Sequence, residues 1–171
     1  FNLKEAARTL NFLTEAGISD YAQLEQRKAE VSARFQEFSG RMKRLEGQMA
    51  EVADLKYHII RYSKTRETYR KYQQAKDKAG FYREYAEEIT QHEAAKKAFD
   101  AFHGEKLPTV SALQSEYRKL LNEKQGLGEE FAKLKKEMQN YRDAKKNVDQ
   151  ILQVEKGEKK EKEKEKGKEE R

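Results

Sequence analysis

The stretch LEQRKAEVSARFQEFSGRMKRLEGQMAEVADLKYHI, residues 24–59, carries an apolar residue every seven positions along its whole length. The repeating positions are Leu24, Val31, Phe38, Leu45, Val52 and Ile59. A companion set falls between them at steps of three and four residues: Phe35, Met42 and Met49, with Lys28 and Lys56 as polar interruptions. This alternation keeps the apolar side chains on one stripe of a helix, a seam, and predicts a left-handed coiled coil.

A second seam lies near the other end of the chain. Its repeating positions are Leu113, Leu120, Leu127, Leu134, Tyr141 and Val148. Its companions are Tyr117, Phe131, Met138 and Leu152, with Lys124 and Lys145 as polar interruptions. Leu24 and Ile59 lie 35 positions apart, as do Tyr117 and Leu152, which corresponds to roughly 50 Å of helix. Two apolar seams of equal length can bury each other within one chain, so we favour a monomeric antiparallel hairpin. The same seams could also pair between two chains as a dimer.

Composition supports an elongated all-α protein. Only 36% of the chain is hydrophobic while 40% is charged, which suits helices with one apolar stripe better than a deep globular core. The absence of cysteine excludes disulfides, thiolate catalysis and cysteine-bound zinc, and fits a cytoplasmic location. No apolar run is long enough to cross a bilayer, so we expect no membrane insertion. Because the first residue is Phe1 rather than Met, we expect a piece of a longer protein.

Local signals divide the chain into an N-terminal helix (1–17), a coiled-coil hairpin (18–154) with a small helical tip at about 60–110, and a charged low-complexity tail (155–171). The expected apolar face of the first helix comprises Leu3, Ala6, Ala7, Leu10 and Leu13, and Gly17 is expected to cap it in a left-handed conformation. Two capping boxes are expected at the starts of the two seam helices, the arms of the hairpin: Asp20 with Gln23 and Ser111 with Gln114. Gly80 is expected to break the first arm before another helix over 81–102. The tail could be disordered or a charged helix.

Residues 57–85 of the tip combine seven aromatic rings with eight Lys/Arg and three Asp/Glu. The rings could form a small core, since a tyrosine can bury its ring while its hydroxyl reaches water. Alternatively, the cations could contact phosphates and the rings could stack on unpaired bases. The candidate DNA-binding residues are Arg61, Tyr62, Lys64, Arg66, Tyr69, Arg70, Lys71, Lys76, Lys78 and Arg83.

Motifs for catalysis or metal binding are missing from the sequence. His58, His92 and His103 show no metal-ligand spacing, and His92 is expected to be a packed residue on the inner face of its helix. There is no phosphate-binding glycine loop, no HExxH and no nucleophile elbow. We therefore expect a non-catalytic chain without a cofactor.

Five strings carry a resemblance to a known family: LNFLTEAGISDYAQLE (10–25), HIIRYSKTRETYRKY (58–72), HEAAKKAFDAF (92–102), KLPTVSALQSEYRKLLNEK (106–124) and KKNVDQIL (145–152). In order and spacing they resemble the C-terminal region of relaxases, the mobilisation nucleases of conjugative and mobilisable elements in Gram-positive gut bacteria. The resemblance runs from about Asn2 to Leu152. It implies a parent enzyme that nicks one DNA strand at a transfer origin, with a tyrosine nucleophile and a histidine-bound metal in an N-terminal domain. Neither motif is present in this chain.

The resemblance implies a non-catalytic accessory domain in the bacterial cytoplasm that assists binding of transfer-origin DNA or assembly of the transfer nucleoprotein complex. The relaxase catalytic domain would then be its covalent neighbour. The alternative is a coiled-coil interaction arm that docks on a coupling protein, an accessory factor or another copy of itself, without contacting DNA. The basic, tyrosine-rich tip favours the first function and the long seams favour the second.

Overall fold

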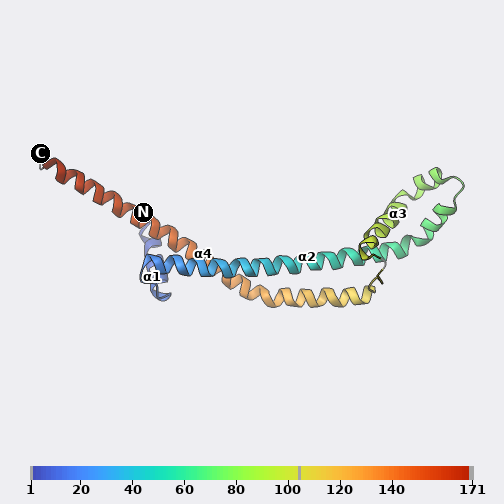
Figure 1. The fold of residues 1–171 in the computed structure, drawn as a ribbon, viewed down its shortest axis with the longest axis horizontal. Coiled ribbons are helices and arrows are strands. Elements are labelled where there is room, and N and C mark those ends of the chain that lie inside the picture. The colour runs from blue at the N-terminus through green and yellow to red at the C-terminus, as the bar shows by residue number, and fades with distance from the viewer. Residues whose placement is uncertain (1, 104, 170–171) are drawn as a thin grey trace. The chain divides into compact units, whose positions relative to one another are not determined.

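The structure, a computed structural model, describes residues 2–103 and 105–169, which contain four α-helices, one short 3₁₀ helix and no strand (Figure 1). The helices are α1 (Leu3–Glu15), α2 (Tyr21–Gln74), α3 (Lys78–Phe99) and α4 (Val110–Glu169), and the 3₁₀ helix η1 spans Asp100–Phe102. The expected all-α class is therefore confirmed.

The chain forms two compact units. Unit 1 consists of Phe1–Gly40 and Gly128–Arg171, and unit 2 of Arg41–Leu127. Unit 1 holds α1, the first part of α2 and most of α4, whereas unit 2 holds the rest of α2, α3, η1 and the beginning of α4.

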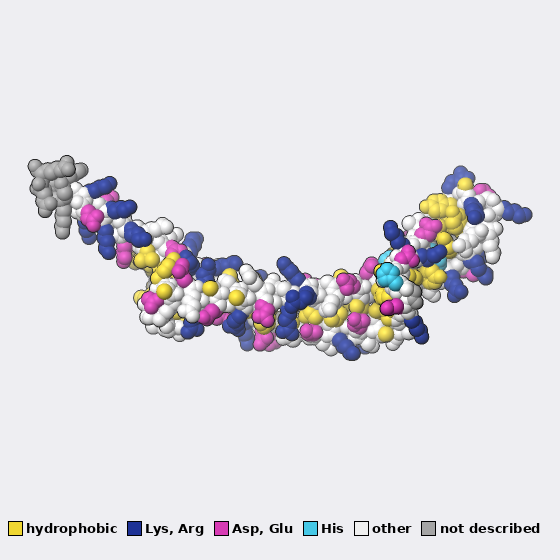
Figure 2. Space-filling view, in the orientation of Figure 1, with side chains coloured by type: hydrophobic (Ala, Val, Ile, Leu, Met, Phe, Trp, Pro, Cys, Tyr) yellow, Lys and Arg dark blue, Asp and Glu magenta, His cyan; other side chains and the backbone are white. Residues whose placement is uncertain are grey.

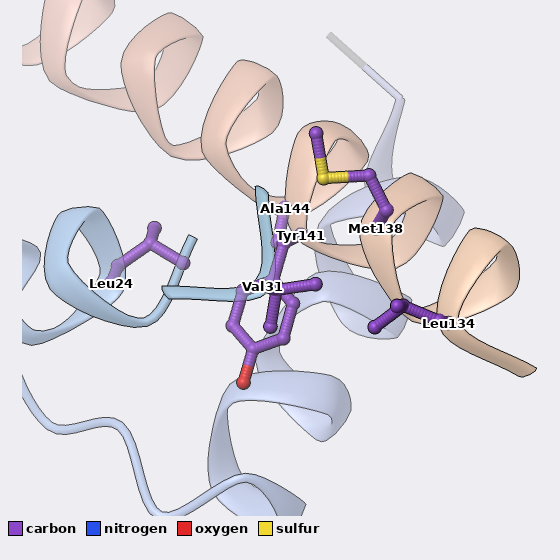
Figure 3. Packing of buried hydrophobic residues seen from close by; sticks show 6 residues of the cluster. All are labelled: Leu24, Val31, Leu134, Met138, Tyr141 and Ala144. Atoms are coloured by element: carbon purple, nitrogen blue, oxygen red, sulfur yellow. The ribbon is translucent and has the colours of Figure 1, made fainter. Parts of the chain in front are cut away.

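In unit 1, α2 and α4 pack antiparallel along their seams. Tyr21, at the start of α2, contacts Asp149 through its hydroxyl (2.6 Å), and Phe35, further along α2, stacks on Phe131 with ring centroids 5.5 Å apart. The buried cluster consists of Leu24, Val31, Leu134, Met138, Tyr141 and Ala144 (Figure 3). Five of these six are seam positions that the heptad pattern predicts, so the antiparallel hairpin is confirmed in this unit.

Helix α1 packs on the same cluster, but through a different face from the expected one. Phe12 meets the ring of Tyr141 edge-on at 5.0 Å, and buried Thr9 accepts a hydrogen bond from Asn147 Nδ2 (2.8 Å). Leu3 and Leu10, expected on the buried face, are 78% and 65% exposed. Leu13 of the expected face does pack against the cluster, so the prediction was wrong for Leu3 and Leu10 and right for Leu13, because the aromatic ring of Phe12 and the Thr9–Asn147 pair turn the helix.

The connection from α1 to α2 follows its sequence signals. Gly17 has φ +68°, and its N–H and that of Ile18 donate to the carbonyls of Thr14 and Leu13, which makes a Schellman motif. The N–H of Gln23 donates to Asp20 Oδ1 (2.8 Å), as expected for an N-cap. The side chain of Gln23 accepts from the N–H of Ser19 (2.9 Å) rather than from that of Asp20.

In unit 2, α2 and α4 are again antiparallel neighbours. Arg41 pairs with Glu123 (3.6 Å) and Glu46 with Lys124 (3.1 Å). The buried seam residues are Leu45, Met49 and Val52 from α2, and Leu113 and Leu127 from α4. Helix α3 folds back along the last turns of α2 (Figure 1), because Tyr72 packs near Phe81 and Tyr62 near Phe99.

Two expected helix boundaries are wrong. Gly80 does not break a helix: α2 ends at Gln74, and Asp77 caps α3 by accepting the N–H of Gly80 (2.9 Å). A Cβ at Gly80 would collide with the Asp77 carboxylate, so glycine allows this cap. Likewise, Thr109 rather than Ser111 caps α4, since its hydroxyl accepts the N–H of Ala112 (3.1 Å).

The charged tail continues α4 as helix to Glu169, and its side chains from Glu155 to Glu165 are exposed. Of the two expected alternatives the structure shows the helix. Phe1, Gly104 and residues 170–171, which belonged to the expected first helix, the turn before the return arm and the tail, lie outside the described residues.

Truncation of a seam leucine is expected to destabilise the unit that contains it. Leu45→Ala in unit 2 and Leu134→Ala in unit 1 remove side chains that are 5% and 3% exposed, so each should lower the free energy of unfolding by roughly 2–5 kcal/mol. Urea titrations would measure this. Lys133→Ala, which removes an exposed side chain next to Leu134, should change it by less than about 0.5 kcal/mol. Equal effects at Lys133 and Leu134 would contradict the seam.

Two glycine-to-alanine substitutions are expected to change stability in opposite directions. Gly17→Ala forces a Cβ into a left-handed conformation and should destabilise by about 1–2 kcal/mol. Gly47→Ala lies inside α2, where a Cβ has no neighbour within 4 Å, and should stabilise by about 0.8–1 kcal/mol. Thermal and urea unfolding would give both signs, and destabilisation by Gly47→Ala would show that its position is crowded.

Candidate nucleic-acid interface

The inner faces of α2 and α3 in unit 2 are held together by a ring sandwich around His92. The imidazole, 3% exposed, stacks between Tyr62 (4.5 Å between centroids) and Tyr69 (4.2 Å). Ile89 and Ala95, one turn away on either side of His92 on α3, are fully buried. The histidine is therefore a packed residue, as expected from its place on the inner face of its helix.

A hydrogen-bond relay fixes the orientation of this imidazole. The Thr65 hydroxyl donates its only proton to the carbonyl of Arg61 (2.7 Å), and the same oxygen lies 2.9 Å from His92 Nδ1. With the hydroxyl directed at Arg61, the Thr65 oxygen accepts from His92 Nδ1–H, which corresponds to the neutral tautomer protonated at Nδ1. Burial lowers the pKa of His92 below its usual value; the nearby charge of Lys96 lowers it further, and that of Glu93 opposes the shift.

The remaining rings form a second group where α2 ends and α3 begins. Tyr72 lies near both Phe81 and Tyr82, and Phe81 packs on Tyr85 at 4.6 Å. Of these rings Tyr82 is the most accessible, at 41% exposed, whereas the other three are half-buried. The chain of α3 has non-helical dihedral angles at Tyr85 (φ −118°, ψ 29°), so the helix is kinked beside this group.

The positive charge of this region belongs to α2 rather than to α3. Between Tyr57 and Gln74, α2 carries five Lys/Arg and one acidic residue, Glu67, whereas α3 carries four Lys/Arg and four Glu. Figure 2 shows Lys and Arg side chains over the surface of the α2–α3 hairpin, with hydrophobic side chains between them. Unit 2 therefore presents a basic surface along one helix.

The ten candidate DNA-binding residues separate into two structural groups. Tyr62 and Tyr69 are half-buried in the sandwich with His92, and Arg61 is half-buried over the ring of Tyr57 (5.0 Å). The exposed cations are Lys64, Arg66, Arg70, Lys71, Lys76, Lys78 and Arg83. Of these seven, Arg70 alone has an ion pair within the described chain, to Glu67 at 2.8 Å. The structure brings the tyrosines together in the core and leaves the cations on the surface.

Sequence reasoning did not select Tyr82 as a candidate, although it is the accessible ring nearest to these cations in sequence, between Phe81 and Arg83. The signal that could have found it is its position on α3: Phe81 and Tyr85, four residues apart, share a face of this helix and pack on each other, whereas Tyr82 lies outside that spacing. For the described residues, no group of three His, Asp or Glu side chains could hold a metal ion. None of the described helices is both long and apolar enough to span a bilayer.

No protein-family model, curated protein or solved structure matches this chain. The class of protein is thus defined by the fold alone, an all-α antiparallel helical hairpin with α3 folded onto it in unit 2.

Acidification is expected to destabilise the protein through His92. The unfolded histidine takes up a proton near pH 6.5, whereas the folded one resists it. As the pH falls below about 6.5, the unfolded chain therefore binds more protons and the free energy of unfolding decreases, until the folded imidazole is also protonated. Urea titrations at several pH values should show a smaller decrease for His92→Gln than for the wild type.

The matched control is His103→Gln, which replaces an exposed histidine. Comparison of the two variants separates the loss of the buried imidazole from the loss of one histidine. If His92→Gln and the wild type lost the same stability on acidification, the buried neutral imidazole would not be the cause.

Proposed function

We propose that unit 2 binds nucleic acid through its phosphates, and that the chain is a non-catalytic accessory domain of a conjugative relaxase. The observation that carries this proposal is a set of exposed cations on and beside the end of α2 that form no ion pair within the described part of the chain: Lys64, Arg66, Lys71, Lys76, Lys78 and Arg83. Exposed cations can release condensed counterions from a phosphate backbone, which favours binding at low salt.

The proposed contact is to the backbone rather than to the bases. Lys64 and Lys71, seven residues apart, share one side of α2, and Arg66 and Arg70 share another side, with Thr65 facing inward between them. Cations on both flanks of one helix suit phosphates that follow the helix on either side. Because Tyr62 and Tyr69 are stacked on His92, they are assigned a positioning role, and Tyr82 is the ring available to stack on an unpaired base.

The assignment to a relaxase rests on the five strings that resemble the C-terminal region of that family. It makes transfer-origin DNA the proposed ligand, the relaxase catalytic domain the neighbour in the parent protein, and the bacterial cytoplasm the place of action. The proposed monomer follows from the pairing of α2 with α4 of the same chain within each unit. A coupling protein or an accessory factor is the proposed protein partner.

Neutralising the α2 cations is expected to weaken DNA binding and its salt dependence. The triple variant Lys64→Gln, Arg66→Gln, Lys71→Gln should reduce the magnitude of the negative slope of log K against log salt. The expected reduction is about 0.9 for each lost contact to double-stranded DNA, or about 0.7 for each lost contact to single strands. Fluorescence anisotropy over a salt series with both kinds of origin DNA would measure it. Unchanged slopes, or no binding of either DNA by the wild type at low salt, would reject the proposal.

The matched control removes the same number of charges from unit 1. Lys133→Gln, Lys135→Gln, Lys136→Gln replaces three exposed lysines of α4 and should leave the slope near that of the wild type. An equal loss in both triple variants would show that net charge, rather than the α2 surface, determines binding.

A further inference from the structure

Unit 2 contains a groove between α2 and α4 that the basic surface does not use. It has a volume of about 500 Å³, and its apolar walls are formed by Val52, Ala53, Tyr57 and Ile60 of α2 and Tyr117 of α4. Tyr57 and Tyr117 are 47% and 37% exposed, although Tyr117 occupies a seam position that was expected to be buried. The seam therefore opens at this place and leaves aromatic side chains accessible. Half-exposed tyrosines over an aliphatic floor are typical of the residues that dominate binding energy in protein interfaces.

The cations beside this groove have no anionic partner. Lys56 and Arg118 line it, no carboxylate does, and neither cation forms an ion pair within the described residues. Lys56 is one of four seam lysines, and two of the others differ from it in this respect. Lys124 pairs with Glu46 at 3.1 Å, and Lys145 pairs with Asp149 at 2.9 Å. At Lys56 the seam therefore has a lysine beside an open groove, and no carboxylate lines that groove.

We propose that this groove binds the apolar face of an acidic amphipathic helix of another protein, with Lys56 and Arg118 engaging its carboxylates. An amphipathic helix places apolar anchors at positions i, i+3, i+4 and i+7, which suits a groove between two helices. Carboxylates on the flanks of those anchors supply the charges that Lys56 and Arg118 lack. This proposal does not depend on DNA binding by the α2–α3 hairpin.

Two other occupants fit the groove less well. A nucleic acid would satisfy Lys56 and Arg118, but Val52 and Ile60 give the floor an aliphatic character that favours an apolar side chain over a base. A second copy could offer Leu3 and Leu10, the most exposed leucines among the described residues. Their helix α1 carries two basic and two acidic residues, so it brings no complementary net charge.

The test is a binding titration with the full chain and a defined probe. The probe is a short fluorescein-labelled model helix with Leu and Phe at every third or fourth position and Glu elsewhere, and its counterpart has Lys in place of Glu. Anisotropy should show saturable binding of the acidic helix, at least about 10-fold tighter than that of the basic helix, a difference of about 1.4 kcal/mol. No saturable binding, or equal binding of both helices, would overturn the proposal.

Neighbouring substitutions on α4 locate the site. Arg118→Glu reverses a charge in the groove, whereas Lys119→Glu makes the same change on the next exposed residue outside it. Arg118→Glu should weaken the acidic helix by about 10-fold, and Lys119→Glu by no more than about twofold. Equal losses would assign the binding to net charge and reject the groove.

Tyr117→Ala tests the apolar wall and separates the occupants. Because this ring is partly exposed, the variant should unfold at nearly the wild-type urea concentration while losing about 10-fold in affinity for the acidic helix. Wild-type affinity in this variant would overturn the apolar contact. Light scattering that shows a dimer of the wild type and a monomer of Tyr117→Ala would overturn the proposal in favour of a second copy. Loss of DNA binding in Arg118→Glu but not in Lys119→Glu would overturn it in favour of nucleic acid.

Discussion

The antiparallel contact between the seams of α2 and α4 is the interaction on which the rest of the structure depends. A chain with 40% charged residues has little apolar material, and the seams concentrate it on one stripe of each long helix. In unit 1 this contact buries Leu24, Val31 and Leu134, and it creates the surface on which α1 packs. In unit 2 it buries Leu45 and Leu113 and fixes the helix against which α3 folds back.

The polar interruptions of the seams determine the register and the accessible surface. Lys145 donates to Asp149 and to the hydroxyl of Tyr21, so one lysine joins the two helices of unit 1. Hydrogen bonds, first from Tyr21 and then from Lys145, hold the pKa of Asp149 below its usual value. Exposed ion pairs contribute little to the free energy of unfolding. They favour one register of α2 against α4, because a shifted register would separate the paired residues. At Lys56, which forms no ion pair within the described residues, the helices leave a groove.

The fold was predictable because the heptad spacing is a property of the sequence, and each buried leucine of the cluster lies at a position that the spacing selects. The structure departs from the heptad pattern at positions where the placement of a neighbouring helix or the local backbone conformation determines the outcome. Ala144 is buried although it lies outside both seam sets, because α1 packs on that face of α4 and a small side chain permits its approach. Leu152 is exposed because α2 begins only at Tyr21, which already lies opposite Asp149. The start of α4 was misplaced because threonine and serine are both good caps, and only the backbone geometry selects Thr109.

The interleaving of tyrosines and cations in the sequence of α2 reflects two faces of one helix. Tyr62, Thr65, Tyr69 and Tyr72 recur at steps of three and four residues, so they turn toward α3, while Lys64, Arg66 and Lys71 turn away. The sandwich around His92 uses the rings and prevents them from stacking on a ligand at the same time. Its effect on the opposite face is rigidity: with α3 held against its inner side, this part of α2 presents its cations from a fixed helix. In the proposed function, binding of phosphates to these cations would then lose less conformational entropy. A cluster of rings would thus support the proposed binding of an anion without touching it.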